Sequence, residues 1–348
     1  MSKKNKWALG IILAFGLFIF LREFRDLSFH EVLEELQHLN WIWVIVGLCC
    51  MLMHWAIEAK IIQGLMKRTR ENFSFKNAVR IPLIEHLFNA ITPFSSGGQP
   101  AQLIAMVKSG VDAGISGSVL LMKFVVYQSM IVINFLLALA LGFHVLKAQI
   151  DELSYFILLA FVIHAVVISS LLLVTFCYPV ANKLVQLAIK PLAFFKSEEQ
   201  FKKLQSDMTD KVKNFYEESK YIRSQKKLLL KTSLLTFIQL IFYFVVPYFI
   251  LLALGMTHVN IMTIIILHTF IIMIISLFPI PGGAGGAEYS FTLLFGSMVT
   301  SPEKLVIALI LWRVITHYTG ILLGVVALGV QPTTEAEEAS SLVTEKIK

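Results

Sequence analysis

Charged residues are scarce in this sequence. Of its 348 residues, 15% are Asp, Glu, Lys or Arg, whereas 57% are hydrophobic, and the mean hydropathy is +0.74. A soluble domain of this length could not cover so much apolar surface with so few charges. The composition therefore excludes a water-soluble protein and makes lipid the main solvent of the chain.

Cysteine is also rare, and the motifs of several enzyme classes are missing. Cys49, Cys50 and Cys177 lie in apolar runs, without a Cys-x-x-Cys pair or a Cys/His cluster at metal-ligand spacing, which is typical of packing residues. The sequence has no P-loop, Gly-x-Ser-x-Gly, His-Glu-x-x-His or dinucleotide fingerprint. We therefore expect no metal, no cofactor, no catalytic residue and no use of ATP in this chain.

The apolar residues gather in runs long enough to cross a bilayer as helices, about 20 residues each. A membrane barrel would instead show short segments of alternating hydrophobicity. We expect an all-α polytopic membrane bundle with seven full spans, at residues 7–21, 41–57, 115–143, 153–178, 228–254, 261–278 and 305–329. The first of these has no small-residue cleavage site after it, so we expect it to remain as an anchor.

The loop charges predict how the bundle is oriented. Residues 22–35 carry five acidic and two basic side chains, whereas residues 60–80 carry six Lys or Arg. Because basic loops stay in the cytoplasm, we expect a cytoplasmic N-terminus, and the net charge of +7 needs no nucleic-acid partner. We expect residues 179–227 to form a cytoplasmic amphipathic linker, and residues 332–348 to form a disordered tail. Seven spans would place the C-terminus outside.

Pro and Gly interrupt two of the apolar stretches. Residues 78–111 contain the run Asn-Ala-Ile-Thr-Pro-Phe-Ser-Ser-Gly-Gly-Gln-Pro, and residues 279–301 begin with Pro-Ile-Pro-Gly-Gly-Ala-Gly-Gly-Ala-Glu. Non-helical backbone at membrane depth needs protein or water around it, so we expect two re-entrant segments. One lies in a first membrane half, 1–178, and the other in a second, 228–331, which indicates a diverged internal repeat. Such pairs point to a transport site near the midplane, although either break alone could simply allow close helix packing.

Polar residues correspond between the two breaks. When the two breaks are aligned, Gln99 corresponds to Glu288. About two dozen residues later Lys123 corresponds approximately to Arg313, and each cation lies inside the next span. A cation there needs a partner or water, and Glu288 is the expected partner of Arg313, while Lys123 could also snorkel to the surface. Glycine-rich turns expose N–H groups that favour anions. We therefore predict a lipid-headgroup site formed by Ser95, Ser96, Gly97, Gly98, Gln99, Lys123, Gly282, Gly283, Gly285, Gly286, Glu288 and Arg313.

Several further polar residues lie in the apolar runs. Glu58, Glu85 and His86 are candidate counter-ions for the two cations, and one of the carboxylates could instead hold the ammonium of a cationic headgroup. Histidines at positions 54, 86, 164, 268 and 317 could form a proton relay. Because they are scattered along the sequence, we expect them to make hydrogen bonds between helices.

The residues around the two breaks also carry a resemblance. The runs at 89–100 and 279–288 resemble the lysylphosphatidylglycerol synthase transmembrane-region family, over nearly the whole chain. That region is the membrane half of the bacterial multiple peptide resistance factor and also occurs as free-standing proteins. The resemblance implies a flippase for aminoacylated phosphatidylglycerol and, in full-length members, a cytosolic domain that transfers lysine from lysyl-tRNA to the lipid. No segment here is long enough for that domain, so we expect only the membrane part.

Together these features lead us to expect a flippase-like transporter in a bacterial cell membrane. It would move an anionic phospholipid, such as phosphatidylglycerol or its lysyl derivative, between leaflets and contribute to resistance against cationic antimicrobial peptides. The alternative is a phosphatidylglycerol lysyltransferase, or the membrane subunit of a headgroup-modifying enzyme, with Glu85, His86 and Glu288 as acid/base groups. A separate transferase and a second copy of the chain are candidate partners.

Overall fold

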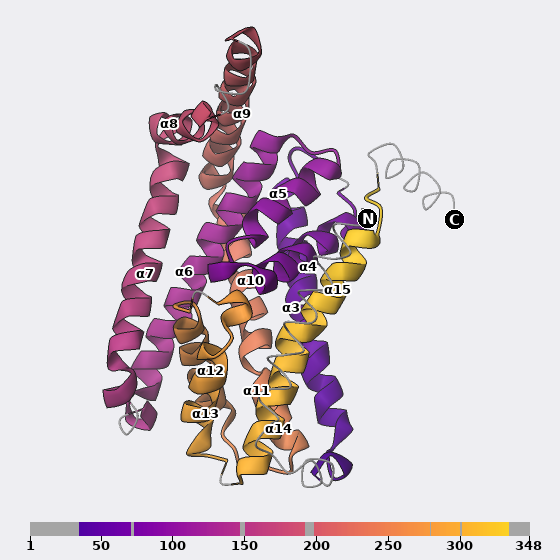
Figure 1. Ribbon diagram of the computed structural model, residues 1–348, viewed down its shortest axis with the longest axis vertical. Coiled ribbons are helices and arrows are strands. Elements are labelled where there is room, and N and C mark those ends of the chain that lie inside the picture. Colours follow the sequence, from indigo (N-terminus) through magenta and orange to yellow (C-terminus); the bar gives the residue numbers. More distant parts are fainter. Residues whose placement is uncertain are drawn as a thin grey trace.

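The computed structural model describes residues 35–70, 73–146, 150–191, 198–278, 280–299 and 301–333. Within these ranges every regular element is a helix (Figure 1). The expected anchor at 7–21, most of the connector that follows it and the tail from residue 334 lie outside the described residues. The all-α membrane bundle predicted from composition is confirmed.

Five stretches of described helix are long and apolar enough to cross a membrane. They are α3 (Trp41–Met66), α6 (Ala113–Leu146), α7 (Ile150–Phe176), α10 (Lys226–Phe244) with α11 (Val246–Ala253), and α14 (Pro302–Arg313) continued by α15 (Thr319–Gly329). Pro247 lacks an N–H group, which explains why α10 and α11 are separate helices in one span. A π-helical turn at Val314–Tyr318 joins α14 to α15.

Each Pro/Gly-rich break forms the tip of a helical hairpin. In the first half α4 (Phe75–Ile91) packs on α5 (Gly98–Lys108), and a 3₁₀ turn, η1 (Pro93–Ser95), lies between them. In the second half α12 (Ile261–Ile275) packs on α13 (Gly286–Gly296), with η3 (Pro281–Gly283) between them. The 15 residues of α12 extend about 22 Å, less than the roughly 30 Å of a hydrocarbon core. The stretch at 261–278 is therefore one arm of the second hairpin, where a full span was expected.

The two hairpins enter the bundle from opposite ends (Figure 1). The first begins at the end that carries the loop after α3, which we call the basic end, and the second begins at the other end. Their tips, η1 and η3, contact each other within the bundle. The flanking spans α3 and α10–α11 also run in opposite directions. The start of α3 lies beside the end of α11, where the Asn40 amide donates to the Ala253 carbonyl. The repeat predicted from the two breaks is thus an inverted repeat.

The end of α15 lies at the basic end. Asn77, in the first turn of α4, donates to the Thr333 carbonyl at 2.9 Å and accepts from the Thr333 amide at 3.1 Å. The expectation that the C-terminus lies on the side opposite the basic loop is therefore wrong for residues 330–333. The physical reason is that the second hairpin returns to the end from which it entered, so it does not move the chain across the membrane.

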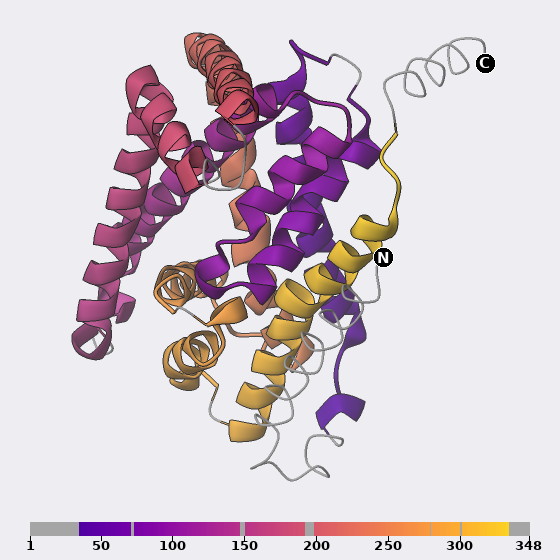
Figure 2. The ribbon, with the colours of Figure 1, turned by 45° about the horizontal axis from the view of Figure 1, so that its top comes forward.

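The polar segment at 179–227 forms two helices at the basic end, α8 (Tyr178–Ile189) and α9 (Glu198–Ser224), which contact each other (Figure 2). α9 packs on α6, where Ser219 and Ser118 hydroxyls share a hydrogen bond of 2.8 Å. Glu218 beside them binds the Arg68 guanidinium at 3.2 Å. Burial raises the pKa of the Glu218 carboxyl, and Arg68 offsets part of that rise.

The interior and the outer surface are both apolar, as expected for a protein surrounded by lipid. In the core, the Phe291 ring stacks on Phe295 and on Trp312, with centroid distances of 4.6 and 5.0 Å. On the outside, Leu158, Val166 and other residues of α7 are exposed. These ring contacts therefore fix α13 of the second hairpin against α14, while α7 presents an apolar face to the surroundings.

Candidate functional site

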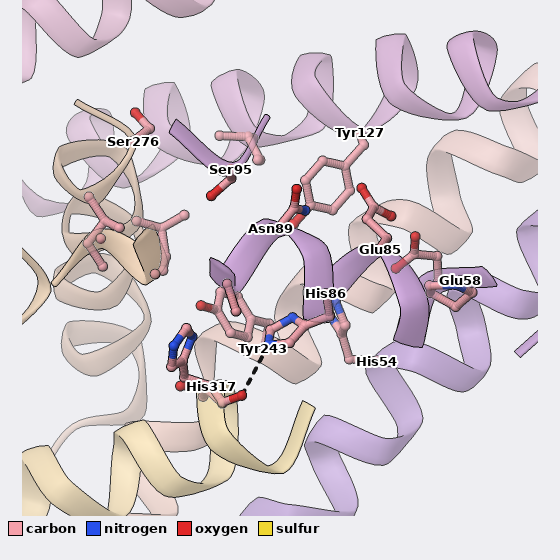
Figure 3. Close-up of a pocket in the computed structure, with 18 of the residues that line it drawn as sticks. His54, Glu58, Glu85, His86, Asn89, Ser95, Tyr127, Tyr243, Ser276 and His317 are labelled. Carbon is pink, nitrogen blue, oxygen red and sulfur yellow. Dashed lines mark hydrogen bonds between the residues drawn. The ribbon is translucent and has the colours of Figure 1, made fainter. Parts of the chain in front are cut away.

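A polar cavity of about 370 Å³ lies where the tips of the two hairpins meet. Its lining comes from both repeats, and Figure 3 shows polar side chains pointing into it from several helices. The polar and glycine residues of the lining are His54, Glu58, Glu85, His86, Asn89, Ser95, Gln99, Lys123, Tyr127, Gln128, His164, Tyr243, Ser276, Gly282, Gly283, Arg313, Thr316 and His317. The cavity is thus the place where most of the predicted site residues come together.

Both predicted cations line this cavity at similar depth from opposite ends. Lys123 lies ten residues after the start of α6, and Arg313 lies 11 residues after the start of α14. At 1.5 Å per residue these positions are about 15 and about 16 Å along their helices, or roughly half of a hydrocarbon core. Since α6 starts at the basic end and α14 at the other end, these depths indicate that both cations lie about midway along the bundle.

Lys123 is held between two carboxyl groups. Its ammonium donates to Glu58 Oε1 at 2.5 Å and to Glu85 Oε2 at 2.9 Å. Glu58 comes from α3 and Glu85 from the first arm of the first hairpin, so the ion pairs connect three elements. Only 5% of Lys123 is exposed, which shows that the side chain does not snorkel to the surface.

Side-chain amides complete the environment of these carboxyl groups. Gln99 donates to Glu85 Oε1 at 2.8 Å, and Gln102 donates to Glu85 Oε2. Gln239 of α10 donates to Glu58 Oε2 at 3.1 Å. Buried carboxylates require such donors, because an unsatisfied charge inside the bundle would be costly.

Arg313 forms the matching centre of the second repeat. Its Nε donates to Glu288 Oε1 at 2.6 Å, its Nη2 also pairs with Glu288, and its Nη1 donates to the Gly282 carbonyl at 3.0 Å. Glu288 Oε2 in turn accepts from the Gly285 amide at 2.6 Å. In each repeat a hairpin therefore provides a carboxylate for the cation of the following span, although Glu85 precedes its break and Glu288 follows it.

The glycine-rich turns contribute shape rather than free amide donors. The Gly97 amide donates to Thr92 Oγ1 at 2.8 Å, and the Gly98 amide donates to Asn89 Oδ1 at 3.0 Å. Together with the Gly285 amide bound by Glu288, these donors are satisfied inside the protein. The expectation that these three amides are available for an anion therefore does not match the structure.

The remaining turn residues have distinct positions. Ser96 folds back on the Pro93 carbonyl and does not line the cavity, whereas the exposed Ser95 does. Gly282 has a φ of +66°, and a Cβ there would lie 2.6 Å from the His317 ring, so this position requires glycine. Gly285 also has a positive φ of +82°, and Gly286 packs against Phe278 outside the cavity.

Three of the five histidines, at positions 54, 86 and 268, make the hydrogen bonds between helices that were expected of all five. His54 bonds the Gln239 carbonyl at 2.9 Å, and His86 bonds the His317 carbonyl at 3.2 Å, which Figure 3 shows as a dashed line. His268 accepts from Trp312 Nε1 at 3.0 Å and bonds the Phe244 carbonyl at 3.1 Å through its other ring nitrogen. His164 instead bonds a carbonyl of its own helix.

The charges of the cavity nearly balance. Lys123 and Arg313 pair with three carboxyl groups: Glu58 and Glu85 line the cavity, whereas Glu288 does not. One carboxyl group of the three therefore has no cation of its own. Neither cation is a free anion-binding group, since each is already paired. Among the described residues, no group of three or more His, Cys, Asp or Glu could hold a metal ion.

Some residues of the site were not identified from the sequence. Asn89 and Thr92 cap the first turn, Gln102 and Gln239 bind the two acids, and Tyr127 and Tyr243 line the cavity. A signal existed for the two glutamines, because amides inside apolar helices seek polar partners. The tyrosines gave no signal, since aromatic residues are common throughout these spans.

Comparison with known proteins agrees with this architecture. The sequence profile of the lysylphosphatidylglycerol synthase transmembrane region matches residues 7–324. The chain is also 26% identical, over 298 residues, to a UPF0104 membrane protein of Archaeoglobus fulgidus. The aligned region covers 84% of this chain and 88% of that protein. Since the profile spans both hairpins and both flanking repeats, the chain belongs to the lysylphosphatidylglycerol synthase transmembrane-region family.

Proposed function

We propose that this protein is a lipid transporter of the flippase type, which moves a phospholipid between leaflets through the cavity between the two hairpin tips. The observation that carries the proposal is the inverted pair of hairpins, whose tips meet beside the charged groups of the cavity. Inverted repeats with broken helices around a central site are the architecture of many secondary transporters. Rocking of one repeat against the other would open the cavity to each side in turn.

The charges of the cavity favour a headgroup that carries both signs. A lipid phosphate could replace a carboxylate at Arg313 or Lys123, and the surplus carboxyl group could bind an ammonium. An aminoacylated phosphatidylglycerol, such as lysyl-phosphatidylglycerol, has both groups. Phosphatidylglycerol alone would bind less well, because it would leave the surplus carboxyl group without a partner.

The location and the physiological role follow from the same reasoning. The basic loop after α3 and the basic end as a whole would lie in the cytoplasm of a bacterial cell, together with the N-terminus. Movement of a cationic lipid to the outer leaflet would repel cationic antimicrobial peptides and so contribute to resistance. A separate transferase that supplies the aminoacylated lipid is a candidate partner.

The test is leaflet exchange in liposomes. Purified protein is reconstituted with fluorescent phosphatidylglycerol or its lysyl derivative, and the fraction of label that a membrane-impermeant quencher reaches is followed over time. We expect exchange with the wild type and at least a tenfold slower rate with Arg313→Ala, since about 1.4 kcal/mol of lost headgroup interaction gives that factor. Equal rates in wild-type, Arg313→Ala and protein-free liposomes would refute the proposal.

A matched control comes from the same helix. Lys304 lies near the start of α14, is 34% exposed in its side chain and does not line the cavity. Lys304→Ala should therefore exchange lipid at the wild-type rate. Lipid composition of cells with and without the gene separates transport from headgroup synthesis: an unchanged composition supports transport, whereas loss of a headgroup species would favour the enzyme.

A further inference from the structure

The Lys123 ammonium is shared by the carboxyl groups of Glu58, which is buried, and Glu85, whose side chain is 15% exposed. Glu58 Oε1 and Glu85 Oε2 lie 2.5 and 2.9 Å from the same Nζ atom, so the two carboxyl groups are close neighbours. Figure 3 shows them side by side on neighbouring helices. Two ionised carboxylates this close repel each other, and a proton on one of them would relieve the repulsion.

Within the described part of the chain, the lining of the cavity supplies no second cation for this cluster. Arg313, the other cation of the cavity, is occupied by Glu288 and the Gly282 carbonyl. With both acids ionised, the cluster would carry one net negative charge in a buried place, and such a charge is usually neutralised by proton uptake. The other titratable groups that line the cavity are His54 from α3, His86 from α4, Tyr127 from α6, His164 from α7, Tyr243 from α10 and His317 from the turn after α14.

A second observation indicates that a proton donor is missing. Gln102 is fully buried, and its Oε1 atom has no hydrogen-bond partner among the residues that the structure describes, while its Nε2 atom donates to Glu85. A buried acceptor without a donor is costly. Once the amide is turned over, a protonated Glu85 would donate its O–H to this oxygen, so the same proton would satisfy both the charge and the acceptor.

We propose that the Glu58–Lys123–Glu85 cluster binds one exchangeable proton, and that this proton leaves when the ammonium of a cationic headgroup enters the cavity. The step is balanced: a neutral carboxylic acid loses its proton to water in the cavity, and the carboxylate that remains pairs with the headgroup ammonium. Lipid movement in one direction would then drive proton movement in the other. The proton site stands on the geometry alone, whereas its coupling to lipid rests on the proposed transport function.

Infrared difference spectroscopy tests the proton site without any transport. Purified protein is titrated with acid and base, and the carbonyl stretch of protonated carboxylic acids is recorded. The wild type should show a pH-dependent band equivalent to one buried carboxyl group, and Glu85→Gln and Glu58→Gln should each abolish it, because either change leaves a balanced pair with Lys123. Glu303→Gln, near the start of α14 and away from the cavity, should retain the band. The same band in both site variants would overturn the proposal.

A pH gradient across the liposome membrane tests the coupling. Wild-type protein is reconstituted with fluorescent lysyl-phosphatidylglycerol, and a gradient of one pH unit is imposed in either direction. For exchange of one proton per lipid, we expect a leaflet asymmetry of up to about tenfold that reverses with the gradient and disappears with a protonophore. Rapid exchange that ignores the gradient would refute the coupling while retaining the transporter, whereas absence of exchange would refute both. In either case the infrared band decides the proton site separately.

Discussion

The ion pair between Glu288 and Arg313 gives the sharpest stability prediction. Glu288 Oε1 accepts from Arg313 Nε at 2.6 Å, and the side chains of both residues are only 11% exposed. Replacement Glu288→Ala leaves Arg313 with the Gly282 carbonyl as its one remaining partner among the bonds seen in the described residues. It also removes the carboxylate that accepts from the Gly285 amide at the start of α13.

The expected loss follows from these contacts. Removal of one partner from a buried ion pair costs about 3–5 kcal/mol, because the other charge stays buried without compensation. The double variant Glu288→Ala/Arg313→Met removes both charges and retains an apolar side chain of similar length. We therefore expect the double variant to be at least about 2 kcal/mol more stable than Glu288→Ala alone.

Equilibrium unfolding in mixed detergent micelles, followed by far-ultraviolet circular dichroism, measures these differences. The matched control is Lys202→Met, which breaks the 2.7 Å pair with Glu198 on the exposed face of α9. That change should cost less than about 0.5 kcal/mol, because exposed pairs of this kind contribute little. A double variant as unstable as Glu288→Ala would refute the view that an uncompensated charge causes the loss.

Two further predictions concern other parts of the fold. Gly324→Ala should lower stability by about 1–3 kcal/mol, because a Cβ there would lie 2.5 Å from the Leu83 carbonyl oxygen of α4, whereas Gly329→Ala meets no atom within 4 Å and should be nearly neutral in thermal unfolding. At the basic end, burial raises the pKa of Glu218, so the folded state binds the proton more tightly than the unfolded state. The free energy of unfolding therefore falls as pH rises from the pKa of the unfolded state through that of the folded state. Glu218→Gln should remove this loss and be the more stable protein at neutral pH. An increase of wild-type stability relative to the variant as pH rises would contradict the reasoning.

The sequence by itself determined the class of protein and the position of the breaks. Hydropathy and charge are local properties, so the membrane bundle, five of its spans and both Pro/Gly-rich tips could be located from the order of residues alone. The same local reasoning identified Lys123 and Arg313, since a charge inside an apolar helix always needs an explanation. It also paired Arg313 with Glu288, which is only 25 residues away in the sequence.

Only the tertiary structure decided how these parts face one another. In the sequence, a 15-residue apolar helix looks like a short span. The structure alone shows that the chain turns back at η3 after α12. This turn inverts the second repeat and places the C-terminal end of α15 at the basic end. Likewise, Glu58 and Glu85 are 65 and 38 residues from Lys123, and no local pattern states that they share its ammonium. Ion pairing inside a membrane depends on which helices pack together, and that packing is set by the whole bundle rather than by any one segment.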